Sequence, residues 1–309
     1  MLPNPPLRDK IPVVEDSSGK QWVELSPAWL KWFSMIQQSM ETILINYKDY
    51  ETGATANAQG IDGALSTIDY LSSLGQGLIA GHTIWHSIGY NPSIGATQED
   101  VNEMGITYTV PSDSGIQMTV RSANVNDTAA GTGVRTVHIN YLDASGLEQT
   151  ETVTTNGGAV NTVATNIRRV NYFHTTSAGS GAVAAGNITL TNTGNTVTYA
   201  QISTGTNFSR HGFFTIPAGK TGFISSAYIG AGSSVSGRFV RALLRTTSDH
   251  HGNRTANIFQ FKRMVLVQDG GIQMKFDIPI KVPALADIKF SAINDTSAEV
   301  ACYIEGWFE

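Results

Sequence analysis

Hydrophobic and polar residues follow two different periods along this chain. From residue 82 onward the two kinds of residue alternate with a period of two, which is typical of half-buried β-strands. Residues 26–43 instead repeat apolar side chains at helical spacing. The chain is therefore predicted to be mainly β: an antiparallel β-sandwich or jelly-roll body, with a short N-terminal extended arm and an α-helical segment.

Turns that contain glycine or proline separate the alternating runs and predict strands joined as hairpins. Residues 135–142 and 148–155 flank an Asp-Ala-Ser-Gly turn, and residues 213–224 turn back at Pro-Ala-Gly. Further strands are predicted at 106–110, 116–121, 167–173, 187–191, 196–203, 237–246, 257–267, 272–281, 287–293 and 298–308.

This pattern divides the chain into four parts. Residues 1–25 are predicted to form an extended arm, and residues 26–80 a helical segment with a linker. Residues 81–205 are predicted to form a β-sandwich, and residues 206–309 either a second sandwich or a continuation of the first.

The first forty residues hold the candidate attachment segment. Prolines keep the first fifteen residues extended, and Ser26-Pro27 is a good helix start. The apolar stripe of the helix either docks on its own domain or packs against sister chains or a neighbouring protein. The residues predicted to make attachment or oligomer contacts are Pro5, Pro6, Leu7, Trp22, Trp29, Trp32, Phe33, Ile36 and Met40.

Charge narrows the possible partners. Only 15% of the 309 residues are charged and the formal net charge is -5, which argues against a nucleic-acid partner. Strand-edge salt bridges account for the local pair Arg168-Arg169 and for Arg238, Arg241 and Arg245. Low charge also suits a subunit whose surface is covered by its neighbours. No stretch is apolar for long enough to predict insertion into a membrane.

Motifs for chemistry are incomplete in this sequence. Gly219-Lys220-Thr221 lacks the first glycine of a phosphate-binding loop, and the pair His82 and His86 lacks the glutamate of the zinc-protease motif. Cys302 lies in an apolar strand and is interpreted as a small buried hydrophobe. We predict no catalytic, cofactor-binding or metal-binding residue, and no enzyme. A carboxylate pair far apart in sequence is the enzymatic alternative.

The most polar cluster lies between two predicted strands. It comprises Asp249, His250, His251, Asn253 and Arg254. Either it is a solvated loop tip, or it is an exposed recognition loop for a metal or an acidic ligand.

The opening residues carry a family resemblance. Pro5-Pro6-Leu7-Arg8-Asp9, the turn at 15–19 and Leu25-Ser26-Pro27-Ala28-Trp29-Leu30-Lys31-Trp32-Phe33 resemble the N-terminus of tailed-bacteriophage virion proteins. Residues 214–221, 280–283, 286–290 and 303–308 are similar in kind to the hairpins and strands of phage β-sandwich modules. The resemblance covers about forty residues at the front and scattered hairpin signatures behind them.

This resemblance implies a non-enzymatic virion structural protein that is assembled in the host cytoplasm. The expected placement is a tail-associated fibre or appendage subunit, anchored to other virion proteins by its N-terminus and forming a homo-oligomer, with a trimer as the first expectation. A head decoration or head-fibre protein on the capsid is the alternative. A tail protein that binds or cleaves a host glycan is the alternative from another class, in which the loop at residues 247–255 would contact the host surface.

Overall fold

The computed structural model describes residues 13–15, 21–23, 31, 34, 70–105, 107–233 and 239–309. The chain forms two compact units, Met1–Gln76 and Gly77–Glu309. In the first unit, β1 (Val13–Glu15) pairs antiparallel with β2 (Gln21–Val23), and α3 (Tyr70–Gly75) is helical. Lys31 and Ser34 are also helical, while the rest of the predicted helix over 26–43 lies outside the described residues.

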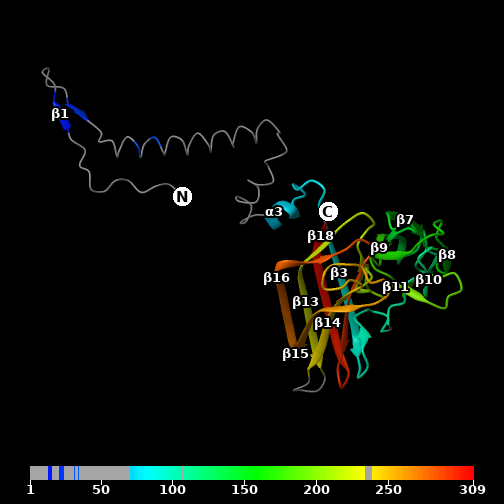
Figure 1. The fold of residues 1–309 in the computed structure, drawn as a ribbon. Coiled ribbons are helices and arrows are strands. Elements are labelled where there is room, and N and C mark those ends of the chain that lie inside the picture. Colours follow the sequence, from blue (N-terminus) through cyan, green and yellow to red (C-terminus); the bar gives the residue numbers. More distant parts are fainter. Residues whose placement is uncertain are drawn as a thin grey trace. The chain divides into compact units, whose positions relative to one another are not determined.

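The second unit contains a β-sandwich of two antiparallel sheets (Figure 1). One sheet has the order β16-β13-β18-β3, and the other has the order β12-β17-β14-β15 with β4 also paired to β17. The bounds of these strands are β3 (Thr83–Ile94), β4 (Glu99–Asp100), β12 (Phe213–Thr215), β13 (Gly222–Ser233), β14 (Val240–Thr246), β15 (Gln260–Val267), β16 (Gly270–Val282), β17 (Asp287–Ile293) and β18 (Ala298–Phe308).

The connections between these two sheets are those of a jelly roll. The chain crosses repeatedly from one sheet to the other. The first jelly-roll strand, β3, pairs with the last, β18, in the sheet of order β16-β13-β18-β3. Alternation along each strand places one set of side chains between the sheets, as in the buried–exposed pattern of β18. The shared core includes Trp85, whose ring stacks on that of Phe214 with centroids 4.5 Å apart. The predicted antiparallel sandwich or jelly roll is therefore confirmed.

An inserted module occupies the chain between β4 and β12 (Figure 1, green strands). Its two sheets have the orders β11-β10-β5-β8 and β7-β6-β9, and its own core lies within residues 118–202. The bounds of its strands are β5 (Met118–Ser122), β6 (Val134–Leu142), β7 (Glu148–Thr154), β8 (Ala159–Asn161), β9 (Arg169–Ala178), β10 (Ile188–Asn192) and β11 (Thr198–Ile202).

The insertion divides one strand of the jelly roll into two short pieces, β4 and β12, which pair with neighbouring parts of β17. On β17, Lys289 pairs with Phe213 of β12, and Ser291 pairs with Asp100 of β4. The chain therefore leaves the jelly roll and returns to it beside the same neighbouring strand, two residues apart on β17.

Two local predictions are wrong, and one is confirmed. The hairpin over 135–155 is confirmed as β6 paired with β7. The predicted hairpin over 213–224 is not formed, because β12 pairs with β17 while β13 pairs with β16 and β18 in the other sheet. Residues 107–110 contain no strand, although their alternation predicted one at 106–110.

Candidate assembly surface and module junction

The predicted attachment residues lie almost entirely outside the described part of the chain. Trp22 is described and lies in β2, where it pairs with Val14 of β1. The other predicted contacts, which stay predictions, are Pro5, Pro6, Leu7, Trp29, Trp32, Phe33, Ile36 and Met40.

The polar loop at Asp249 is closed by its own hydrogen bonds. The Asp249 carboxylate accepts bonds from the amides of His251 at 2.9 Å and Asn253 at 2.8 Å, and from Asn253 Nδ2 at 2.9 Å. These bonds to Asn253 and His251 lower the pKa of Asp249. Arg254 Nε donates to the carbonyl of Leu285 at 2.9 Å, while the side chains of His250 and His251 are exposed. The predicted recognition role of this loop stays a prediction, with the two histidines as its accessible groups.

His82, His86 and Cys302 each have different partners in the fold. His82 Nε2 lies 2.8 Å from a carboxylate oxygen of Glu309, whereas the His86 ring packs beside Tyr172 and Tyr303. Cys302 is buried, and burial raises the pKa of its thiol to about 12. Within the described ranges, no group of three or more His, Cys, Asp or Glu side chains is placed to hold a metal ion.

The apolar surface of the jelly roll is concentrated on its two outer strands, β15 and β16. On β15, Phe261, Met264 and Leu266 are 58%, 60% and 55% exposed, and Ile278 on β16 is 85% exposed. Each strand ends its sheet in the described structure, so one backbone edge of each is unpaired. Exposed apolar side chains beside open strand edges favour association with another chain. We call these four residues the β15–β16 surface.

A groove of about 560 Å³ lies beside this surface where the two sheets separate. Val265 from one sheet and Met274 and Phe276 from the other line it, and all three are only partly buried. The Arg263 guanidinium lies 5.4 Å from the centre of the Phe276 ring, which it partly covers. The groove therefore exposes apolar side chains that pack against the jelly-roll core.

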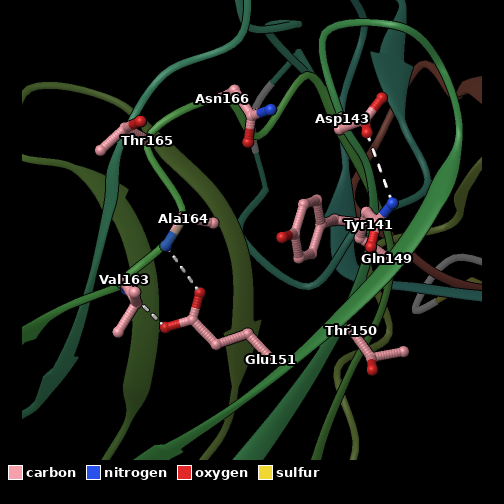
Figure 2. Close-up of a pocket in the computed structure, with 9 residues that line it drawn as sticks. All are labelled: Tyr141, Asp143, Gln149, Thr150, Glu151, Val163, Ala164, Thr165 and Asn166. Atoms are coloured by element: carbon pink, nitrogen blue, oxygen red, sulfur yellow. Dashed lines mark hydrogen bonds between the residues drawn. The ribbon is translucent and has the colours of Figure 1, made fainter.

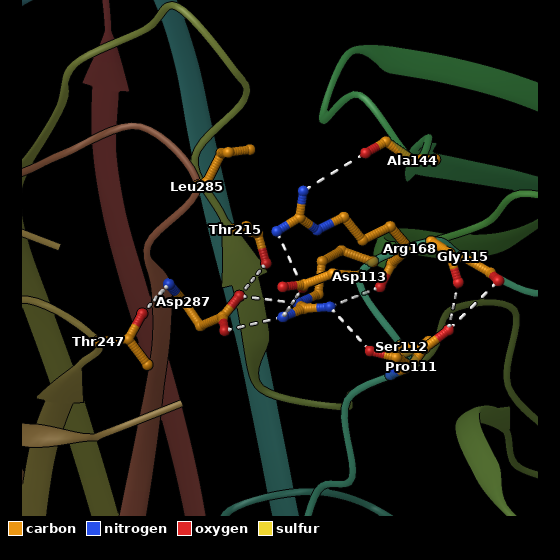
Figure 3. Close-up of polar contacts among 12 residues, drawn as sticks. Pro111, Ser112, Asp113, Gly115, Ala144, Arg168, Thr215, Thr247, Leu285 and Asp287 are labelled. Atoms are coloured by element: carbon orange, nitrogen blue, oxygen red, sulfur yellow. Dashed lines mark hydrogen bonds and ion pairs between the residues drawn. The ribbon is translucent and has the colours of Figure 1, made fainter. Parts of the chain in front are cut away.

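A buried ion pair joins the inserted module to the jelly roll, and Figure 3 shows Asp287 and Thr215 on the jelly-roll side. Arg169, at the start of β9, is 1% exposed, and its Nε donates to Asp287 Oδ1 on β17 at 3.0 Å. The hydroxyl of Thr215 donates to the same carboxylate at 2.7 Å, and the amide of Asp287 donates to the Thr247 hydroxyl at 2.8 Å. The carboxylate accepts three hydrogen bonds, one from Thr215 and two from Arg169, whose Nη2 also donates to Asp287 Oδ2 at 3.4 Å. Its charge is therefore compensated inside the protein.

Two further contacts lie next to this ion pair. Within the inserted module, Arg168 forms an ion pair with the more exposed Asp113 at 2.9 Å. Tyr172 on β9 accepts a hydrogen bond from the amide of His86 at 3.2 Å, and its ring packs 5.8 Å from that of Phe214. Burial of the phenol raises the pKa of Tyr172 to about 12, so its hydroxyl keeps its proton. The module is therefore held by packing as well as by charge.

The sequence pattern predicts strand-edge salt bridges for both members of the arginine pair. Arg168 does pair with a partly exposed carboxylate, whereas Arg169 is buried and crosses to a partner 118 positions away. At Phe261, Met264 and Leu266 the alternation predicts only a strand. The local pattern does not show that these side chains stay exposed, because this depends on how far the second sheet extends over the outer strand.

The comparisons with known proteins identify no family for this chain. No protein-family model matches it, and no curated protein matches it significantly. Solved structures with weak similarity include an empty virus-like particle of cowpea mosaic virus, at 11% identity and a TM-score of 0.18, covering 62% of this chain and 80% of that chain. They also include the infectious bursal disease virus VP2 subviral particle, at 12% identity and a TM-score of 0.17, covering 74% and 76%. At these scores the similarity carries no argument about the function of this chain.

Proposed function

We propose that this chain is a non-enzymatic structural subunit of a virus particle, with the jelly roll as its self-associating body. The β15–β16 surface is the observation that carries the proposal. It combines open backbone edges with exposed Phe261, Met264, Leu266 and Ile278, which a subunit buries when it assembles. The occupant we propose for this surface is a second copy of the same chain. A trimer is the first expectation for the assembly.

Within the particle, we propose a tail-associated fibre or appendage subunit of a bacteriophage, anchored by its N-terminal segment and exposing its β body to the host. The resemblance of residues 5–33 to phage virion proteins supports this placement. Head decoration or a head fibre on the capsid is the second candidate. Both candidates use the same arm and differ in the surface that receives it.

Light scattering of the purified full chain over a range of concentrations tests self-association. We expect an oligomer that dissociates on dilution, and Met264→Lys together with Leu266→Lys to yield a monomer, because two charges then replace apolar contacts. Val125→Lys is the matched control, since Val125 is 77% exposed on the inserted module. A wild-type chain that stays monomeric at high concentration contradicts the proposal.

Placement requires the intact particle. Gold-labelled antibody against this chain, imaged by electron microscopy, should mark the tail and show few copies per particle. Label spread over the shell would assign the chain to the capsid. No label on purified particles would contradict the virion proposal as a whole.

One further finding concerns membranes: among the residues that the structure describes, no helix is both long enough and apolar enough to cross a bilayer.

A further inference from the structure

A hollow of about 550 Å³ lies on the inserted module, and none of the residues of the β15–β16 surface line it (Figure 2). Its walls are the end of β6 at Tyr141, the turn at Asp143, the first residues of β7 and the segment 163–166. This volume falls within the usual range of small-ligand sites, about 300–1,000 Å³. The lining is mostly hydroxyl, amide and carboxylate groups, and it contains no Lys, Arg or His.

The hydroxyl of Tyr141 points into this hollow (Figure 2). The residue is only 6% exposed, and its hydroxyl makes no hydrogen bond to any residue that the structure describes. Burial, together with the charges of Glu151 and Asp143, raises the pKa of Tyr141, so the hydroxyl keeps its proton and is a hydrogen-bond donor. The side chain is buried up to its tip, and the hydroxyl at that tip is left for water or a ligand in the hollow to satisfy.

The carboxylate groups of the hollow are held in fixed positions (Figure 2). Glu151 accepts hydrogen bonds from the amides of Val163 at 2.6 Å and Ala164 at 3.0 Å, which attaches the segment 163–166 to β7. Asp143 accepts bonds from the amides of Ser145 at 2.8 Å and Leu147 at 3.1 Å. Each carboxylate has about four acceptor positions, so both retain capacity for a ligand donor.

These groups select a ligand by its charge and its hydrogen-bonding groups. Two carboxylates in a lining that holds no cation disfavour an anionic ligand. The acceptors require donors from the ligand, while the Tyr141 hydroxyl and the Asn166 amide offer donors in return. Val163, which is 88% exposed, provides a small apolar wall. A ring that carries several neighbouring hydroxyls meets all of these conditions.

We propose that this hollow on the inserted module binds a neutral saccharide unit, which Tyr141 and Asn166 contact directly. The proposal goes beyond the structural role given above and does not depend on it. A chain that fails to assemble could still bind sugar, and an assembled particle could lack the site.

The test is saturation-transfer NMR on the full chain with sugars that differ in charge. The neutral probes are glucose, galactose, mannose, rhamnose and N-acetylglucosamine, while glucosamine and glucuronate carry opposite charges on the same ring. We expect transfer to at least one neutral probe and none to glucuronate. No transfer to any neutral probe overturns the proposal. Transfer to glucosamine alone, or calcium binding detected by titration calorimetry with no neutral sugar bound, overturns it in favour of a cation site.

Two variants connect binding to this hollow. Tyr141→Phe removes the hydroxyl donor without breaking a hydrogen bond within the described part of the protein, so the fold should be retained. We expect the affinity for the sugar to fall about fivefold. Asn166→Ala should weaken binding to a similar degree. Tyr199→Phe is the matched control, because Tyr199 is 4% exposed in the same core and does not line the hollow. Equal affinities for Tyr141→Phe and this control would place the sugar elsewhere and refute the assignment.

Discussion

At the scale of single residues, Arg169 brings a full charge into a place where 1% of its side chain meets water. Such a charge is tolerated because Asp287 compensates it, and removing either partner leaves the other buried and unpaired. Substituting one partner and then both partners therefore separates the effect of the charge from the effect of packing.

We predict that Arg169→Leu lowers the free energy of unfolding by about 3–5 kcal/mol, because Asp287 is left as an uncompensated charge. Adding Asp287→Leu should recover part of this loss, since no buried charge then remains. Urea denaturation of both variants measures the effect, with Arg241→Leu at an exposed position as the control. Additive losses in the double variant would show that the pair is not coupled.

His211 gives the fold a defined response to acid. Burial lowers its pKa to about 4 from the ordinary value of 6.5, against the opposing effect of its hydrogen bonds to Val170 and Ser209. The unfolded chain therefore takes up this proton at a higher pH than the folded chain does. The stabilising contribution is complete above pH 6.5 and is lost as the pH falls from 6.5 towards 4.

We expect His211 to account for about 3 kcal/mol of the stability lost between pH 7 and pH 4. His211→Gln should therefore flatten the plot of unfolding free energy against pH across that window. Urea midpoints at a series of pH values measure the slope, and His250→Gln, at an exposed position, should leave it unchanged. Parallel curves for the wild type and His211→Gln would rule out this source of acid sensitivity.

At the scale of elements, β3 packs closely at Gly89 against the segments that contain Val101, Gly212 and Cys302. A side-chain carbon at Gly89 would lie 2.6 Å from Cys302 Sγ and 3.0 Å from the backbone of Gly212, with the carbonyl of Val101 in contact as well. Backbone atoms cannot move aside as a flexible side chain can. Glycine is required there because of this proximity.

Gly89→Ala should lower the unfolding free energy by about 2 kcal/mol or more, because the added methyl group overpacks this crossing. Gly232→Ala is the matched strand control, since a methyl group added there would have no atom within 4 Å. That substitution should be neutral or stabilise by up to about 1 kcal/mol. Thermal denaturation of the two variants provides the comparison, and equal melting temperatures would contradict the packing argument.

Elements defined by neighbouring residues could be predicted from the sequence, whereas pairings between distant strands could not. The turn at Asp143 to Gly146 joins β6 to β7 because its local hydrogen bonds reverse the chain. The turn after Ile216 has a similar composition but connects two different sheets, and only the distant partners β17 and β18 determine this. The hollow at Tyr141 likewise depends on residues 163–166, which no local pattern places beside Glu151.

At the scale of the whole molecule, two hydrophobic cores share one compact unit. The Arg169–Asp287 pair and the contact of Tyr172 with Phe214 couple them.

We predict a single calorimetric transition for residues 77–309 in the wild-type chain, with the calorimetric and van't Hoff enthalpies equal. Arg169→Leu should separate it into two transitions, whereas Arg241→Leu should not. Two transitions in the wild type would show that the junction does not couple the cores.

The interrupted strand position beside β17 also makes the jelly roll a natural carrier for other modules. Because Asp100 and Phe213 face positions two residues apart on β17, the ends of the insertion lie roughly 7 Å apart along that strand. A folded domain whose termini lie that close, and which supplies a cation for Asp287 in place of Arg169, could replace the inserted module without changing the order of the surrounding strands. Exchange of that segment would then give a chain a new outer domain while the strands that carry it stay as they are.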